Sequence, residues 1–202
     1  MLTEKEELVR KGYNLIAGKY HANRDIFDNK KELEAFVGLL PRSADVLDLG
    51  CGAGIPVTKF LIDYGFNVIG IDFSENMLNL AIKNVPEARF IKKNMTDVDF
   101  NDNSFDGLTA CYSIIHVPRE KHVSLFQMFH RILRPNGVLL ISMGSNGWEG
   151  TEDFHGTEMF WSHYSPEITL QIVTDAGFEI LFDKIVVDSG EKHYWILAKN
   201  KK

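Results

Sequence analysis

The feature that most restricts the possible folds of this chain is a short apolar segment that ends in a cluster of glycines. Residues 45–49 read Asp-Val-Leu-Asp-Leu, and residues 50–54 read Gly-Cys-Gly-Ala-Gly. An apolar run of this length, followed at once by residues that permit sharp turns, is typical of a buried strand in a parallel sheet. A helix is predicted next, over residues 55–64. The segment therefore predicts an α/β domain with a ligand-binding turn at the carboxyl end of a strand.

The rest of the chain continues this alternation of strands and helices. Further strands are predicted at 67–71, 89–91, 105–112, 138–142, 178–187 and 193–199, and further helices at 3–20, 30–39, from residue 74, at 119–133 and at 166–176. Alternation of this kind favours a doubly wound, mostly parallel sheet with helices on both faces. The last two strands share a tight turn at 188–190, so we expect them to pair antiparallel. Residues 134–137 are predicted to form a turn.

The charge and the cysteines restrict the environment and the partners. The formal net charge is -6, which opposes binding to the backbone of a nucleic acid. Cys51 and Cys111 do not make a disulfide framework, and we expect reduced thiols in the cytoplasm. The first residues lack the apolar core of a signal peptide, and no stretch is long enough for a transmembrane helix. We therefore expect a cytoplasmic protein that does not bind a membrane, with its oligomeric state left open.

Asp72 follows the second strand of the alternation and should lie beside the glycine loop, because neighbouring parallel strands end at the same edge of a sheet. A carboxylate there can accept hydrogen bonds from both hydroxyls of a ribose, which indicates a nucleoside cofactor. The dinucleotide pattern GxGxxG needs a third glycine at position 55, where this chain has Ile55. This difference and the closing hairpin argue against a nucleotide-dependent oxidoreductase, which remains an alternative.

Four segments resemble consecutive motifs of the class I S-adenosylmethionine-dependent methyltransferases, in the same order and at similar spacing. They are VLDLGCGAG (46–54), GIDFSENML (70–78), SFDGLTACYSIIHVP (104–118) and LRPNGVLLIS (133–142). The resemblance implies a seven-stranded sheet of order 3-2-1-4-5-7-6 with strand 7 antiparallel. It implies S-adenosyl-L-methionine as cofactor and S-adenosyl-L-homocysteine as product.

The resemblance also assigns expected roles at the cofactor. Gly50 and Gly52 would lie against the methionine part, Asp48 would brace the loop, and Asp72 would hold the ribose. The other expected contacts are Phe73 and Met77 at the adenine, and Cys111 and Tyr112 at the methionine end.

The adenine contact departs from the family pattern. Asn94, followed by Met95, stands where the family usually has an aspartate that takes the adenine amino group. The amide oxygen of Asn94 can still accept that hydrogen bond, and Asp97 is the alternative.

The N-terminal segment YNLIAGKY (13–20) resembles a Tyr-x-x-Ile-Ala-x-x-Tyr helix of the family. The resemblance implies that Tyr20 closes over the cofactor. We therefore expect one methyltransferase domain over residues 1–202, in which residues 1–40 form a helical lid. The alternative is a structural role, in which Tyr13 and Tyr20 form a helix face that packs on the sheet.

Residues 143–165 form a long connection rich in glycine, aromatic residues and histidine, and long connections usually carry a function. We expect this insert to build the acceptor side, and we expect a small-molecule acceptor whose reacting atom stays open. The expected substrate residues are Tyr112, His116, Trp148, His155, Trp161 and His163, of which the three histidines are the candidate bases. No metal site is expected. A non-catalytic, cofactor-binding or regulatory role is a second alternative.

Overall fold

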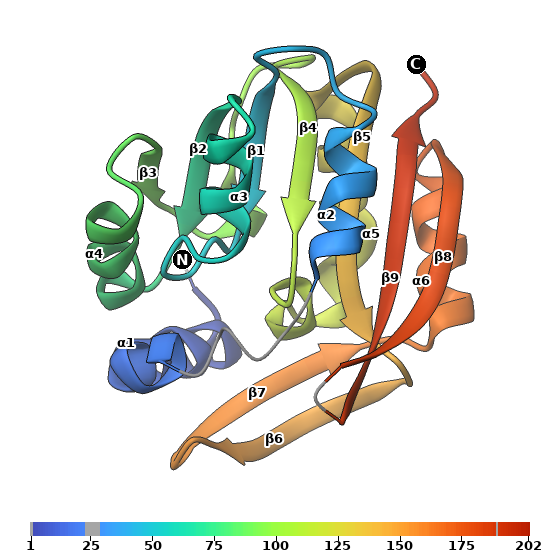
Figure 1. Ribbon diagram of the computed structural model, residues 1–202. Helices are drawn as coiled ribbons and strands as arrows, with labels where there is room; N and C mark the ends of the chain where they lie inside the picture. Colours follow the sequence, from blue (N-terminus) through green and yellow to red (C-terminus); the bar gives the residue numbers. More distant parts are fainter. Residues whose placement is uncertain (1, 23–28, 189) are drawn as a thin grey trace.

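The computed structural model describes residues 2–22, 29–188 and 190–202. These described residues form a seven-stranded sheet of order β3-β2-β1-β4-β5-β9-β8 (Figure 1). Its strands are β1 (Asp45–Leu49), β2 (Asn67–Asp72), β3 (Arg89–Lys92), β4 (Phe105–Ala110), β5 (Leu133–Gly144), β8 (Phe178–Asp188) and β9 (Glu191–Asn200). The first five are parallel, and β9 is antiparallel to both of its neighbours. The expected strand order is confirmed.

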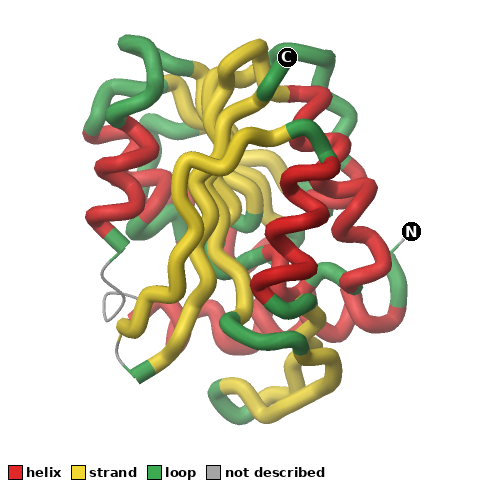
Figure 2. The backbone as a smooth tube through the Cα atoms, turned by 90° about the vertical axis from the view of Figure 1, so that its right-hand side faces the viewer, coloured by secondary structure: helices red, strands yellow, loops and turns green. Residues whose placement is uncertain are grey.

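Helices cover both faces of this sheet (Figure 2). They are α1 (Glu4–Ala22), α2 (Lys30–Val37), α3 (Val57–Asp63), α4 (Glu75–Asn84), α5 (His122–Ile132) and α6 (Pro166–Asp175). One core cluster joins the sheet to α2 and α3, where Phe36 and Leu61 are fully buried. The other joins it to α5 and α6 through Phe126, Phe129 and Val173. Because strands buried on both faces must be apolar throughout, the near-continuous apolar runs in β1, β4 and β5 follow from this layering.

The predicted turn at residues 134–137 is wrong, because these residues lie within the bounds of β5. The pairing of β4 with β5 shifts register between Phe105 and Gly107. Asn136 takes a left-handed conformation with φ 63°. The strand absorbs the Pro-Asn-Gly sequence as a local irregularity at its start, where a proline does not interrupt central pairing.

Residues 143–165 are also more regular than predicted. They contain a two-stranded antiparallel hairpin, β6 (Trp148–Phe154) and β7 (Thr157–His163), outside the main sheet. The hairpin turns at His155 and Gly156, which both have positive φ, of 57° and 88°. Two left-handed residues give the turn that best matches strand twist. The sequence signal was weak because histidine is an uncommon first residue of such a turn.

The helix α1 and the hairpin lie together across the carboxyl edge of the sheet (Figure 1). Val9 and Ile16 of α1 pack against Met159 and Phe160 of β7 in a separate apolar cluster. A Cβ on Gly12 would lie 2.8 Å from the Met159 Cε, so glycine at this position leaves room for the Met159 side chain between the helix and the strand. The expected lid, residues 1–40, includes residues 1 and 23–28, which lie outside the described residues. Ser189, in the turn predicted at 188–190, also lies outside the described residues.

Within the described residues, none of the helices has the length and apolar character needed to cross a membrane.

Candidate functional site

A cavity lies under α1, at the carboxyl ends of β1, β2, β3 and β4. The empty space inside it is about 950 Å³, including the part that is open to solvent. All eleven residues expected at the cofactor line it: Tyr20, Asp48, Gly50, Gly52, Asp72, Phe73, Met77, Asn94, Met95, Cys111 and Tyr112. Residues from four strand ends and two helices, α1 and α4, therefore converge on a single space, as expected for an open α/β sheet where the winding direction reverses.

The glycine loop forms the floor of this cavity. Gly50 has φ 73°, and a Cβ built on it would lie 2.3 Å from the Ser113 Cβ. Its backbone N–H and that of Cys51 donate to the Ile71 carbonyl, at 2.8 and 3.0 Å. The loop is thus bound to the end of β2 and to the segment after β4. Only glycine fits at position 50, so the backbone itself lines the cavity there.

Asp48 is buried and supports this loop from below. Its carboxylate accepts hydrogen bonds from the hydroxyls of Thr58, at 2.6 Å, and Thr109, at 2.9 Å. These two donors come from α3 and β4, so the carboxylate links three elements around the loop. This arrangement agrees with a bracing role for Asp48.

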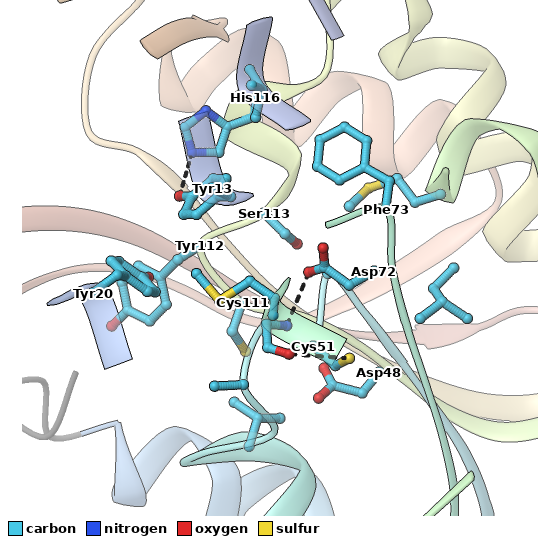
Figure 3. A pocket seen from close by; sticks show the side chains of 18 of the residues that line it. Tyr13, Tyr20, Asp48, Cys51, Asp72, Phe73, Cys111, Tyr112, Ser113 and His116 are labelled. Atoms are coloured by element: carbon cyan, nitrogen blue, oxygen red, sulfur yellow. Dashed lines mark hydrogen bonds between the residues drawn. The ribbon is translucent and has the colours of Figure 1, made fainter. Parts of the chain in front are cut away.

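Asp72 lies at the end of β2 and reaches the cavity beside the loop (Figure 3). Its two carboxylate oxygens accept from the backbone N–H groups of Gly52, at 3.0 Å, and Ser74, at 2.8 Å. Burial raises the pKa of Asp72 to about 6, and the backbone hydrogen bonds oppose this rise. Burial also raises the pKa of the Cys51 thiol, so that thiol is neutral. A carboxylate with free lone pairs therefore faces the cavity at neutral pH, as hydroxyl recognition requires.

At the end of β3, the structure favours Asn94 over Asp97 as a cavity residue. Asn94 lines the cavity, and its Oδ1 accepts from the Thr96 N–H at 3.3 Å. Its Nδ2 donates to the Glu6 carboxylate at 3.0 Å. Asp97 is exposed and does not line the cavity.

Elsewhere in the cavity wall, a tyrosine and a histidine are hydrogen bonded (Figure 3). The Tyr13 hydroxyl lies 2.8 Å from Nε2 of His116, and Nδ1 of His116 lies 2.7 Å from the Phe160 carbonyl oxygen. A carbonyl can only accept, so Nδ1 carries the proton and Nε2 accepts from Tyr13. Burial lowers the pKa of His116 to about 4, with the Phe160 carbonyl opposing it and His163 adding to it. The imidazole is therefore neutral with a fixed tautomer.

Of the six expected substrate residues, only Tyr112 and His116 line the cavity. Trp161 packs against His116 in a tilted arrangement, with ring centroids 4.3 Å apart. His163 is buried, and its Nδ1 lies 2.6 Å from the Asn146 carbonyl oxygen, which gives it a structural partner. The structure therefore places Trp161 next to the cavity wall and His163 inside the base of the hairpin.

The two other expected substrate residues lie on the hairpin itself. The partly exposed ring of His155 lies at its turn, with its centroid 6.3 Å from that of Tyr20. Trp148 is partly exposed at the start of β6. Neither lines the cavity, so the hairpin lies behind α1 and His116 without forming the cavity surface.

The sequence reasoning missed several cavity residues, and three of them have side chains that form hydrogen bonds at the cavity. Glu6 has its carboxylate buried in the cavity wall, although it was assigned no role from the sequence. Tyr13 was noticed in the N-terminal motif without a role at the cavity, and Ser113 was inside a quoted motif without an assigned role. A signal existed only for Tyr13, which lies seven residues before Tyr20 and so on the same face of the helix.

Among the described residues, no cluster of acidic, histidine and cysteine side chains could hold a metal ion.

The fold and the cavity define a Rossmann-like α/β domain with a nucleoside-type pocket at the switch point of its sheet. A family model for a methyltransferase domain matches residues 46–137, which contain the glycine loop, Asp72, Asn94 and His116. Together with the strand order, this match supports the resemblance of the chain to the class I S-adenosylmethionine-dependent methyltransferase family.

Individual relatives are similar over parts of their length. The chain is 32% identical over 112 residues to YqeM of Bacillus subtilis, covering 53% of this chain and 45% of that protein. It is 32% identical over 131 residues to phosphoethanolamine N-methyltransferase 2 of Caenorhabditis elegans, covering 62% of this chain and 29% of that one. The chain thus spans less than half the length of these two relatives.

Solved structures share the fold at lower sequence identity. The 1,6-didemethyltoxoflavin-N1-methyltransferase of Burkholderia thailandensis, solved with 1,6-didemethyltoxoflavin and S-adenosylhomocysteine bound, superposes with a TM-score of 0.74 at 20% identity. The match covers 100% of this chain and 92% of that one. At this identity the likeness shows a common fold.

Proposed function

We propose that this protein transfers the methyl group of S-adenosyl-L-methionine to a small-molecule acceptor. The observation that carries the proposal is the position of Gly50 and Asp72. The glycine floor, into which a Cβ does not fit, adjoins a carboxylate that can accept two ribose hydroxyls. When bound, S-adenosyl-L-methionine supplies an activated methyl group on a sulfonium, and the protein has to bind and orient it.

The residues of the chain then have distinct tasks. The glycine loop and Cys111 hold the methionine part, and Asp72 holds the ribose. Tyr20 on α1 lies over the cavity, and we propose that residues 1–40 act as the lid. Holding the acceptor, the methyl carbon and the sulfur in line supplies much of the rate. Exclusion of water by the lid strengthens each polar contact inside.

The acceptor end is best described by the Tyr13–His116 pair. A histidine whose pKa is lowered to about 4 binds a proton poorly at neutral pH. We therefore propose that His116 holds the Tyr13 hydroxyl in place at the acceptor end through a hydrogen bond, and that it does not store a proton. The acceptor then arrives already deprotonated or loses its proton to water.

A small acceptor fits the enclosure better than a macromolecule. α1 and the β6–β7 hairpin close the carboxyl edge of the sheet (Figure 1). The net charge of -6 gives no support for nucleic acid. We propose that the insert 143–165 serves the acceptor side indirectly, because Phe160 fixes the His116 tautomer and Met159 supports α1.

Calorimetric titration with S-adenosyl-L-methionine, and separately with NAD, tests the cofactor. We expect micromolar binding of the first and none of the second. Release of S-adenosyl-L-homocysteine on addition of small amines, phenols or thiols then tests the reaction. Binding of NAD alone would support an oxidoreductase instead. Tight cofactor binding without turnover of any acceptor class would favour a non-catalytic member of the fold.

Two tryptophan variants separate the acceptor side from the cofactor side. Trp161→Ala removes the ring behind His116, so we expect a raised KM or lowered kcat for the acceptor. Trp148→Ala changes a partly exposed position on the same hairpin and serves as the matched control. Both variants should keep cofactor affinity, and loss of cofactor binding in both would place the acceptor pocket elsewhere.

A further inference from the structure

A buried carboxylate lies at one end of the cavity without a role in the proposed chemistry. Glu6 on the first turn of α1 is 3% exposed and lines the cavity. Its Oε2 accepts from the N–H and the hydroxyl of Thr3, at 2.8 and 2.9 Å. Its Oε1 accepts from Nζ of Lys121, at 2.7 Å, and from Nδ2 of Asn94, at 3.0 Å. Carboxylates are almost never buried to this degree unless they are paired, and these partners explain how the charge is kept.

The order of the strands tells which part of a nucleoside lies near Glu6. The ends of β1, β2 and β3 follow one another along the sheet edge and carry the glycine loop, Asp72 and Asn94. A ligand whose ribose is held at Asp72 and whose amino-acid part lies at the loop must direct its base toward β3. Asn94, and Glu6 behind it, are therefore at the base end.

The amide of Asn94 is held in one orientation by two independent contacts. The Glu6 carboxylate can only accept, so it faces the NH₂ group of Asn94. The backbone N–H of Thr96 can only donate, so it faces Oδ1. Oδ1 keeps a second lone pair. Donation to a buried carboxylate also makes the amide oxygen a stronger acceptor, because linked hydrogen bonds polarise one another.

We infer that Glu6 is a positioning residue for base recognition, which holds the Asn94 amide so that its oxygen accepts the exocyclic amine of the cofactor's adenine. The inference rests on the proposed function, in which the cavity holds S-adenosyl-L-methionine. In this arrangement the Glu6 carboxylate on the N-terminal helix does not contact the base. It acts on the base by polarising the Asn94 amide. It also makes base recognition depend on α1 being in place.

The family pattern has an aspartate at position 94, but the inference predicts that an aspartate weakens binding in this chain. Asn94→Asp would place a second carboxylate against Glu6, and two carboxylates in contact cannot both ionise without a large penalty. We expect this variant to bind the cofactor more weakly than the wild type. The Glu6→Gln/Asn94→Asp double variant exchanges the two groups and restores one carboxylate–amide pair. We expect it to bind within about threefold of the wild type, a coupling that contacting residues commonly show.

The decisive experiment compares two ligands that differ only in the amine. S-adenosyl-L-homocysteine and its 6-deamino analogue, with purine in place of adenine, are titrated calorimetrically into the wild type, Glu6→Gln and Glu4→Gln. Glu4 is exposed on the same helical turn, so its variant removes the same charge without touching the cavity. We expect the wild type and Glu4→Gln to prefer the amine-bearing ligand by about tenfold. In Glu6→Gln the preference should fall to about threefold or less.

The possible outcomes separate the inference from simpler readings. A wild type that binds both ligands equally overturns the inference without any variant. If Glu6→Gln weakens both ligands by the same factor, Glu6 only anchors α1 and the inference is wrong. If Glu6→Gln does not fold, the double variant decides, and affinity as low as that of Asn94→Asp overturns the inference. If neither ligand binds the wild type, the proposed function itself fails.

Discussion

Replacement of Asp72 by alanine tests the cofactor site most directly. Each oxygen of its carboxylate already accepts one backbone N–H, from Gly52 at 3.0 Å and from Ser74 at 2.8 Å. Each oxygen keeps a further lone pair, so two ribose hydroxyls can be accepted without breaking these bonds. Without the carboxylate, the hydroxyls are left without a partner in a partly dry cavity, at about 1–3 kcal/mol. The Kd should therefore rise roughly 5- to 150-fold.

The measurement is a calorimetric titration with S-adenosyl-L-homocysteine, with circular dichroism to verify that the variant is folded. Asp63→Ala is the control, because Asp63 is exposed at the end of α3 and carries the same charge outside the cavity. Its ion pair is a surface pair of small energetic weight. A folded Asp72→Ala protein with an unchanged Kd would falsify the ribose assignment.

The same carboxylate predicts how binding depends on pH. Burial raises the pKa of Asp72 to about 6, so the group takes up a proton as the pH falls through 6 and loses acceptor sites. We expect the Kd to rise roughly tenfold between pH 7 and pH 5. The folding stability of the free protein depends on pH in the opposite direction. The folded-state pKa lies above the usual value of 3.8, so this group makes the fold more stable as the pH falls from about 7 toward 4. Asp72→Ala should abolish the Asp72-dependent parts of both effects, and an unchanged profile in that variant would contradict the assignment.

Further predictions concern the floor and the acceptor end of the cavity. Gly50→Ala should lower the unfolding temperature more than Gly65→Ala. Both positions have positive φ, which strains alanine by about 1–2 kcal/mol, but only at Gly50 would the new Cβ also lie against Ser113. Equal decreases of the unfolding temperature in the two variants would refute the close approach. Tyr13→Phe leaves the buried Nε2 of His116 without its donor, so we expect reduced stability by about 1–3 kcal/mol and slower methyl transfer, with cofactor Kd within twofold. A turnover rate equal to that of the wild type would show that the Tyr13–His116 pair has only a packing role.

Much of the cofactor site was predictable because its residues are local to strand ends. The positions of Gly50 and Asp72 follow from two apolar strands and the rule that parallel strands end at one edge. The order of the sheet followed from the resemblance, and all the expected cofactor residues line one cavity. The acceptor side was much harder to predict, because Trp148, His155 and His163 come from a segment whose only sequence signal was its composition.

The sequence by itself determined the alternation of elements, the glycine loop and the carboxylate beside it, because backbone freedom and apolar periodicity act over a few residues. Only the tertiary structure decided which side chains share the cavity. Glu6 and Asn94 lie 88 residues apart and meet through the packing of α1 on the sheet edge. Tyr13 and His116 lie 103 residues apart and meet in the same way. Such pairings arise because burial of α1 against β7 removes apolar surface from water, and no short stretch of sequence records which distant polar groups that burial brings together.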